Sequence, residues 1–313
     1  MSRGPAPQRG DSPRERGSPH YAAPVRTERL WGAALWLAVL AGCDDDVTLA
    51  PLEDHVATTP AASASAASCG GTVLFGRPVA RTGLSEDECQ PRCTCGGATF
   101  EAPVYGQSDI DELLSWSLES PPADLEADPY AAPPRAPSPP EEVCAVLPSP
   151  SGGKTYTLAS YASLAAARAA GATVTHYGAC GLCSSLANLA VYMKFPDLTA
   201  PVRDCGIKGL GGDEATQLAC LEKLGLEHAC AQIWSYNTDH TRAVCFDTCI
   251  AALGAPYQNA DGSLNACLQC DEDQSGAVFK AVAGRTRRNT GIASALCRPC
   301  SEVRPLLHQY STR

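Results

Sequence analysis

The amino-acid sequence predicts a mainly α-helical, disulfide-rich protein with a few short strands, in which a small cysteine-rich N-terminal module precedes a larger helical domain. Three observations support this fold class. The chain of 313 residues contains 17 cysteines. Apolar residues recur at helical spacing through most of the segment after residue 160. Only residues 154–158 and 172–176 have the pattern of short strands.

A short apolar run follows two arginines near the N-terminus. Residues 30–41 read Leu-Trp-Gly-Ala-Ala-Leu-Trp-Leu-Ala-Val-Leu-Ala behind Arg26 and Arg29, as in the basic and apolar regions of a secretory signal. The run is too short to cross a bilayer as a helix, which takes about 20 apolar residues. It ends in Leu-Ala-Gly-Cys43 and resembles a bacterial lipoprotein signal. This resemblance implies export, lipidation of Cys43 and anchoring to the inner or outer membrane, facing the periplasm or the cell surface.

The first 24 residues do not fit an ordinary signal. They are rich in proline, arginine, glycine and serine and have no apolar period, so we expect a disordered leader. A start at Val25 would give the short basic region that such signals normally have, and a GTG codon encodes valine internally but methionine at a start. We therefore interpret residues 1–42 as a signal peptide with a disordered leader, and our hypothesis is that translation begins at Val25.

The charge of the chain excludes one class of partner. The sequence has 24 basic and 34 acidic residues. Residues 1–42 hold six of the bases and three of the acids, so the chain from Cys43 onward carries 18 against 31, a net charge of −13. A general nucleic-acid binder normally presents a basic face. We therefore expect no nucleic-acid partner.

The cysteines predict disulfides. Apart from Cys43, 16 cysteines remain, an even number. An exported chain lies in an oxidising compartment, where such cysteines normally pair rather than bind zinc. Three pairs have the spacing Cys-x-x-Cys, at 180–183, 267–270 and 297–300, and none is followed by histidine, which excludes c-type haem attachment. We expect disulfides and no cofactor.

Composition divides the mature chain into four parts. Residues 43–68, the lipidated cysteine and a flexible tether, cannot bury a core. Residues 69–118 form the small module, which has enough cysteines for two bridges of its own. Residues 119–143 are a proline-rich, semi-extended linker. Residues 144–313 form the helical domain, where Cys144 completes an even set of 12 cysteines. The cysteines of the small module are Cys69, Cys89, Cys93 and Cys95.

Apolar periodicity and capping residues predict the helices. In the small module, Ile110, Leu113 and Leu114 share one face of a helix. In the domain, glycines follow several periodic segments at positions suited to helix C-caps. Cys245 and Cys249 are four residues apart and share a helix face. The expected helices span 109–118, 162–170, 184–194, 213–224, 230–236 and 241–253.

The sharpest candidate for chemistry is Cys180-Gly181-Leu182-Cys183. At a helix N-terminus the dipole lowers the thiol pKa, and the thiolate is the nucleophile in disulfide exchange. The order strand, helix, strand, Cys-Gly-x-Cys, helix resembles the first half of a thioredoxin-type fold, which implies that Cys180 attacks and Cys183 resolves. The aromatic residue usual before that motif is absent, and no matching second half follows. We therefore expect a structural disulfide, with redox activity as the alternative.

His176 lies four residues before Cys180. In a redox site, His176 would lower the pKa of the Cys180 thiol. In a metal site, it would bind the metal together with Cys180 and Cys183. A single histidine in an apolar strand is more commonly a hydrogen-bonded core residue. We favour the core position for His176.

Two further motifs suggest ligand sites. Asp271, Asp273 and Ser275 match the first positions of a calcium-binding EF-hand loop, but Val282 stands where the bidentate glutamate belongs. Helix caps or turns are the preferred interpretation, and calcium binding is the alternative.

Residues 274–313 carry a net charge of +6, and residues 101–147 carry a net charge of −9. The basic cluster, including Arg285, Arg287 and Arg288, is interpreted as a solvated face or as a face covered by the acidic linker, with binding of anionic lipid headgroups or an acidic glycan as the alternative.

These observations favour a non-enzymatic function. The sequence contains no Gly-x-Ser-x-Gly, His-Glu-x-x-His or paired-acid signature. The leading hypothesis is a lipid-anchored cell-envelope protein that acts as a binding or structural module for an envelope partner or ligand. The alternative is a membrane-tethered thiol–disulfide oxidoreductase that uses Cys180 and Cys183.

Overall fold

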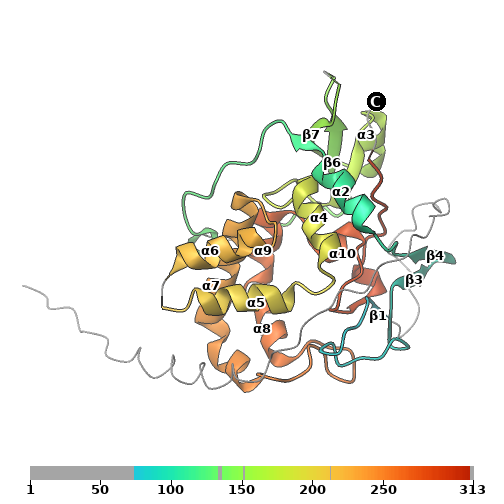
Figure 1. Ribbon diagram of the computed structural model, residues 1–313. Helices are drawn as coiled ribbons and strands as arrows, with labels where there is room; N and C mark the ends of the chain where they lie inside the picture. The colour runs from blue at the N-terminus through green and yellow to red at the C-terminus, as the bar shows by residue number, and fades with distance from the viewer. Residues whose placement is uncertain (1–73, 133–135, 151, 212, 311–313) are drawn as a thin grey trace, which may run out of the picture. The chain divides into compact units, whose positions relative to one another are not determined.

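The fold is mixed α/β rather than mainly α-helical. A computed structural model describes residues 74–132, 136–150, 152–211 and 213–310 (Figure 1). The helical and disulfide-rich character predicted from the sequence is confirmed, but strands contribute more than expected. Cys43, the signal segment and the tether lie outside the described residues.

The main sheet has four strands in the order β5-β7-β6-β8. Strand β6 is antiparallel to both β7 and β8, whereas β5 is parallel to β7. The strands expected at 154–158 and 172–176 are confirmed as β7 and β8. Strand β6 was not predicted, and it begins at the expected boundary between the linker and the helical domain. The strands are β5 (Ser117–Leu118), β6 (Val143–Pro148), β7 (Thr155–Tyr161) and β8 (Thr173–Tyr177).

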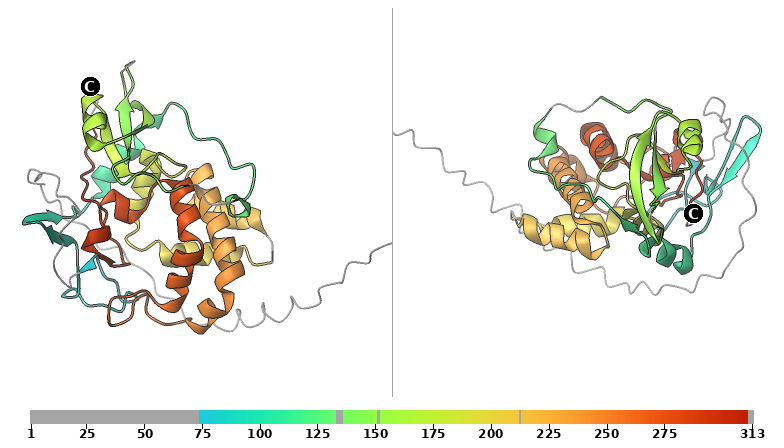
Figure 2. Two further views of the ribbon diagram at one scale, coloured as in Figure 1. Left: turned by 180° about the vertical axis from the view of Figure 1, so that it is seen from behind. Right: turned by 90° about the horizontal axis from the view of Figure 1, so that it is seen from above.

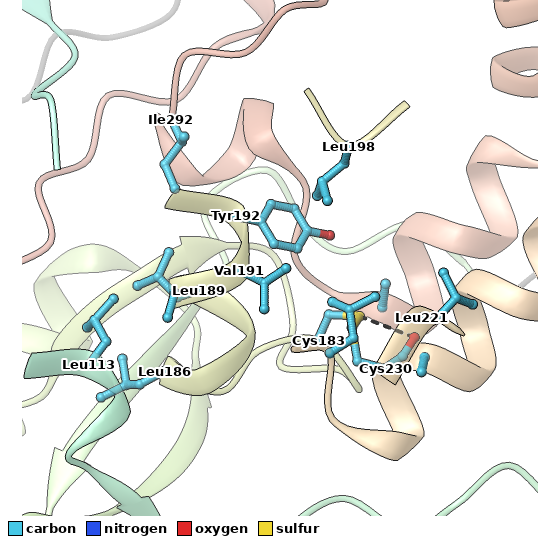
Figure 3. Packing of buried hydrophobic residues seen from close by; sticks show 14 of the residues in the cluster. Leu113, Cys183, Leu186, Leu189, Val191, Tyr192, Leu198, Leu221, Cys230 and Ile292 are labelled. Carbon is cyan, nitrogen blue, oxygen red and sulfur yellow. Dashed lines mark hydrogen bonds between the residues drawn. A yellow bond between two sulfur atoms is a disulfide. The ribbon is translucent and has the colours of Figure 1, made fainter. Parts of the chain in front are cut away.

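Helices cover both faces of this sheet. On one face, Ala167 of α3 (Leu164–Ala169) packs in a cluster with Val143 and Ala145 of β6. On the other face, Val146 packs in the main core with α2 (Gln107–Leu114) and α4 (Leu186–Lys194). Adjacent residues of β6 point to opposite faces, as the pleat of a strand requires. Figure 3 shows the main core where leucines of α2 and α4 meet.

The remaining helices follow α4 along the chain. Asp213 caps α6 by accepting from the N–H of Thr216, and Gly225 follows that helix with a φ of 105°, as the sequence predicted. The expected helices at 230–236 and 241–253 are one continuous helix, in which Asn237 and His240 form hydrogen bonds with Asp271 and Ser275. The helices are α5 (Thr199–Lys208), α6 (Glu214–Lys223), α7 (His228–Ala251), α8 (Ala266–Gln274), α9 (Gly276–Ala283) and α10 (Arg287–Thr290).

The N-terminal described segment is joined to the end of the chain. Strand β1 lies between β2 and β9, and disulfides connect Cys89 to Cys297 and Cys93 to Cys300. Two of the cysteines expected to pair within residues 69–118 are thus bridged to the end of the chain instead, and the described residues cluster as one compact unit. The short strands are β1 (Leu74–Phe75), β2 (Cys89–Gln90), β3 (Arg92–Cys95), β4 (Ala98–Glu101) and β9 (Arg298–Pro299).

Disulfides also fix the helices. Cys245–Cys270 and Cys249–Cys267 staple α7 to α8, and Cys205–Cys220 joins α5 to α6. Every cysteine within the described residues is disulfide-bonded. Such extensive pairing is typical of an oxidising, extracytoplasmic environment.

No helix in the described part of the chain is both long enough and apolar enough to span a membrane.

The proline-rich linker is held against the domain. Residues 119–132, here called the strap, run from β5 to α7, as the two views of Figure 2 show. The N–H of Leu125 donates to Gln232 Oε1 at 2.7 Å. The ring of Tyr130 stacks on His240 with centroids 4.3 Å apart, and its hydroxyl donates to Asn237 Oδ1. The strap therefore forms one wall of the surface described next.

Candidate functional site

A pocket of about 300 Å³ lies between the strap, β7, α9 and the loop that carries Cys180. Four segments that are far apart in the sequence supply its walls. Its volume is at the lower end of the range for small-molecule sites, about 300–1,000 Å³. The lining residues are Leu118, Ser120, Pro122, Leu125, Leu158, Cys180, Gly181, Leu182, Ala281 and Val282.

The chemistry of this lining favours binding over catalysis. Leucine, valine, alanine and proline side chains dominate it, and Ser120 supplies a hydroxyl. Cys180 is oxidised, so no residue lining this pocket offers a titratable side chain. Acid–base catalysis needs such a group within hydrogen-bond reach of the substrate. The half-open pocket offers aliphatic side chains together with a hydroxyl and main-chain polar groups, a lining that can hold a ligand group by contact and hydrogen bonding.

The walls of the pocket are bonded to one another. The N–H groups of Leu182 and Cys183 donate to the carbonyls of Val282 and Ala283, at 3.0 and 2.9 Å. This close approach requires glycine at position 181, where an added Cβ would lie 2.4 Å from the Val282 carbonyl oxygen. The Cys144–Cys180 disulfide fixes the same loop to β6. The cavity is thus preformed in the fold.

Cys180 and Cys183 are bonded to different partners, not to each other. Cys180 pairs with Cys144, and Cys183 pairs with Cys230 of α7. The second bridge is buried in the main core beside Leu221 (Figure 3). A thiol–disulfide oxidoreductase needs the two cysteines of its motif to form one reversible bond. The redox alternative lacks that pair in this structure, whereas the expectation of structural disulfides agrees with it.

His176 is completely buried, in agreement with the favoured interpretation. Its Nδ1 lies 2.9 Å from the carbonyl oxygen of Tyr177, so Nδ1 carries the hydrogen. Its Nε2 then accepts from the Ser184 hydroxyl at 2.6 Å, and that hydroxyl oxygen accepts from the N–H of Gly181. Burial and the charge of Arg285 hold the pKa of His176 well below its usual value. His176 therefore holds Ser184, which accepts from Gly181 in the loop that carries Cys180, and His176 itself does not line the pocket.

Arg285 does not form part of a basic surface, because its side chain is fully buried. Its guanidinium donates to the carbonyl oxygens of Thr175, Cys183 and Ser184 and to the Thr175 hydroxyl, at 2.6 to 3.0 Å. Burial lowers its pKa to about 10, which still leaves the group charged at neutral pH. Arg285 thus connects β8 to the loop that carries Cys180 and Cys183 by hydrogen bonds, and its guanidinium is not exposed to bind an anionic ligand.

The other two arginines of the expected anionic-ligand patch are also engaged. Arg287 donates to the main-chain carbonyls of Tyr192 and Phe195. Arg288 forms ion pairs of 2.6 Å with Glu272 and Glu302. The prediction of a solvated or anion-binding face at these three arginines is therefore wrong. Their positive charge is used inside the fold, which a charge count along the sequence cannot reveal.

The candidate calcium residues do not form a loop. Asp271 and Asp273 lie in α8, and Ser275 follows at the junction with α9. Asp271 accepts from Thr241 and Asn237 of α7, while Asp273 accepts from Gln269 of its own helix. Burial raises the pKa of Asp271 above its usual value, although the hydrogen bonds from Thr241 and Asn237 act to lower it. The described residues contain no cluster of side chains able to hold a metal ion. The EF-hand alternative is therefore wrong, because the segment continues as helix.

Of the residues that line the pocket, only Cys180, Gly181, Leu182 and Val282 belong to motifs recognised in the sequence, and none of those motifs predicted a pocket. One signal was present: Leu118 and Leu125 are isolated apolar residues in an acidic, proline-rich stretch. Leu158 and Val282 join these leucines in one pocket only through long-range folding, which spacing along the chain does not reveal.

Comparison with known proteins gives one match. Residues 214–305 match the model of a family of unknown function (DUF8771). This segment spans α6 to β9 and includes the α9 wall of the pocket, but not the strap or β7. No curated protein and no solved structure matches the chain.

Proposed function

We propose that this protein is a lipid-anchored binding module of the bacterial cell envelope, which holds an apolar group of its ligand in the pocket between the strap and α9. The observation that carries the proposal is a half-open pocket whose side chains are mostly aliphatic and whose walls are bonded to one another. Its lining has no titratable side chain, and hydrogen bonds and a disulfide fix its walls.

The anchor is supported by the sequence. The arginines before residue 30, the apolar run of 30–41 and the small residues before Cys43 together resemble a lipoprotein signal. Each buried methylene of an attached acyl chain contributes about 0.8 kcal/mol, so several chains hold a protein stably where one does not. The complete pairing of the described cysteines is consistent with export.

Anchoring is tested by metabolic labelling with a clickable fatty acid and by membrane fractionation. We expect label on the wild-type chain in the membrane fraction. Cys43→Ser removes the acceptor thiol, so the label should disappear and the protein should be released or mislocalised. Label that persists on the Cys43→Ser protein would contradict the anchor.

Pocket binding is tested on the purified chain from residue 44 onward with prodan, a small uncharged solvatochromic dye. We expect saturable binding with a blue shift of the dye emission. Ala281→Trp places a large side chain in the pocket and should weaken binding at least about tenfold. The matched control is Ala243→Trp, which changes an exposed alanine of α7 outside the lining. Equal binding by both variants would contradict the site.

A further inference from the structure

The outer edge of β7 is only partly covered by β5. The two strands pair over two positions, Ser117 with Thr155 and Leu118 with Tyr156. The last hydrogen bond between these segments runs from the N–H of Glu119 to the carbonyl of Tyr156, at 2.9 Å. The chain then leaves the sheet as the strap, while β7 continues to Tyr161.

The main-chain groups of Leu158 and Ser160 point toward this open edge. Ser149 donates to the Thr155 carbonyl on the β6 side, so Thr155, Thr157 and Ala159 face β6. Tyr156, Leu158 and Ser160 alternate with them and face β5. Among the described residues, no main-chain partner from another strand lies beside Leu158 and Ser160 on that side. An open edge of this kind can accept an added strand.

The pocket lies at the same edge. The side chain of Leu158 lines the pocket, and so do Leu118 and Leu125 from the segment that departs from the sheet. A peptide paired with Leu158 and Ser160 would therefore run along the mouth of the cavity. Alternate side chains of an added strand point to the same face, so one of them could enter the pocket.

The strap gives this site an acidic rim. Glu119, Asp124 and Glu126 are exposed and alternate along the chain with residues that line the pocket. Asp124 approaches His228 at 4.0 Å, and neither Glu119 nor Glu126 forms an ion pair with another described residue. Free carboxylates around the pocket attract positive charge on a ligand.

We infer that the pocket and the open edge of β7 form one site for an extended, basic peptide segment. The segment adds as a strand beside Leu158 and Ser160, inserts one aliphatic side chain into the pocket, and places its cationic side chains near the acidic rim. This inference rests on the proposed function and specifies its ligand class.

The test measures fluorescence anisotropy of a labelled peptide, Lys-Val-Leu-Val-Lys-Gly, with the purified chain from residue 44 onward. We expect saturable binding that weakens as salt rises, because screening reduces attraction to the rim. Two altered peptides separate the contributions. Glutamate in place of both lysines should weaken binding at least about tenfold through repulsion. N-methylation of alternate residues removes the ladder donors and should weaken it similarly.

Variants of the protein test the same contacts. The triple variant Glu119→Gln, Asp124→Asn, Glu126→Gln should lose about tenfold in affinity and most of the salt dependence. Its matched control removes three exposed acids elsewhere and should bind within about twofold of wild type. That control is Glu86→Gln, Asp87→Asn, Asp247→Asn.

Four outcomes would overturn the inference. Equal affinity for the N-methylated peptide would exclude strand addition, and equal affinity for the acidic peptide would exclude the charge preference. If prodan binds in the pocket but the basic peptide does not, the inference fails while the proposed function stands. If neither binds, both fail.

Discussion

The main-chain N–H of Leu182 donates a 3.0 Å hydrogen bond to the carbonyl oxygen of Val282, and both residues line the same pocket. Two segments about 100 residues apart are thus joined at the cavity itself. The contact brings their backbones so close that Gly181 has no room for a side chain. The shape of the pocket is therefore coupled to this one backbone contact.

Gly181→Ala should damage both stability and binding. The added Cβ would lie 2.4 Å from the Val282 carbonyl oxygen, which is backbone and cannot rotate away. We expect a loss of about 1–3 kcal/mol in the free energy of unfolding and weaker prodan binding. Denaturant titration measures the first effect. Gly106→Ala is the control, because its Cβ would have no neighbour closer than 3.9 Å. Unchanged stability of Gly181→Ala would show that the loop and α9 are not held together as described.

Arg285→Met should strongly destabilise the fold. The substitution keeps much of the apolar stem but leaves the buried carbonyls of Thr175, Cys183 and Ser184 without their donor. Each orphaned buried group costs about 1–3 kcal/mol, so we expect a total loss above about 3 kcal/mol. Arg168→Met changes an exposed arginine of α3 and should stay within about 0.5 kcal/mol of wild type. A small effect at Arg285 would mean that water replaces the guanidinium.

Stability should fall as the pH drops below about 6.5, the ordinary histidine pKa. Burial and the charge of Arg285 lower the pKa of His308 to about 3, and the same causes lower that of His176. The unfolded chain therefore binds protons that the folded chain excludes. Each histidine should contribute a slope of up to about 1.4 kcal/mol per pH unit. Urea unfolding between pH 7.5 and 5 measures this slope, because exposed carboxylates titrate lower. A flat stability profile over this interval would contradict the buried neutral histidines.

Glu272 should contribute stability that is lost at more acidic pH. Burial raises its pKa, but the attraction of Arg288 and Lys280 outweighs burial and holds the value at about 2. Arg298 adds a further contact of 3.2 Å. Glu272→Gln should therefore destabilise the protein at pH 7 by about 1–3 kcal/mol, and this difference should shrink as the pH falls from about 4.5 to 2. A constant difference over that range would mean that the effect of the mutation is steric.

The sequence predicted the local features of the fold better than its long-range contacts. The ends of α6 followed from Asp213 and Gly225, because capping depends on neighbouring residues. The Cys89–Cys297 bridge could not be predicted, since spacing does not specify which distant cysteines meet. Arg285 was likewise expected in a surface cluster, because the sequence does not show long-range contacts. In the fold it is buried between β8 and the loop that carries Cys180 and Cys183. The pocket needs four separate segments, so periodicity could not indicate it.

The most direct test of the central claim is disulfide mapping of the mature protein by mass spectrometry without reduction. If the protein is a binding module whose pocket is fixed by structural bridges, and not a thiol–disulfide enzyme, linked peptides should join Cys144 to Cys180 and Cys183 to Cys230. A peptide containing a Cys180–Cys183 bond would contradict it, because the loop would then be free of β6 and α7 and the redox pair would be present.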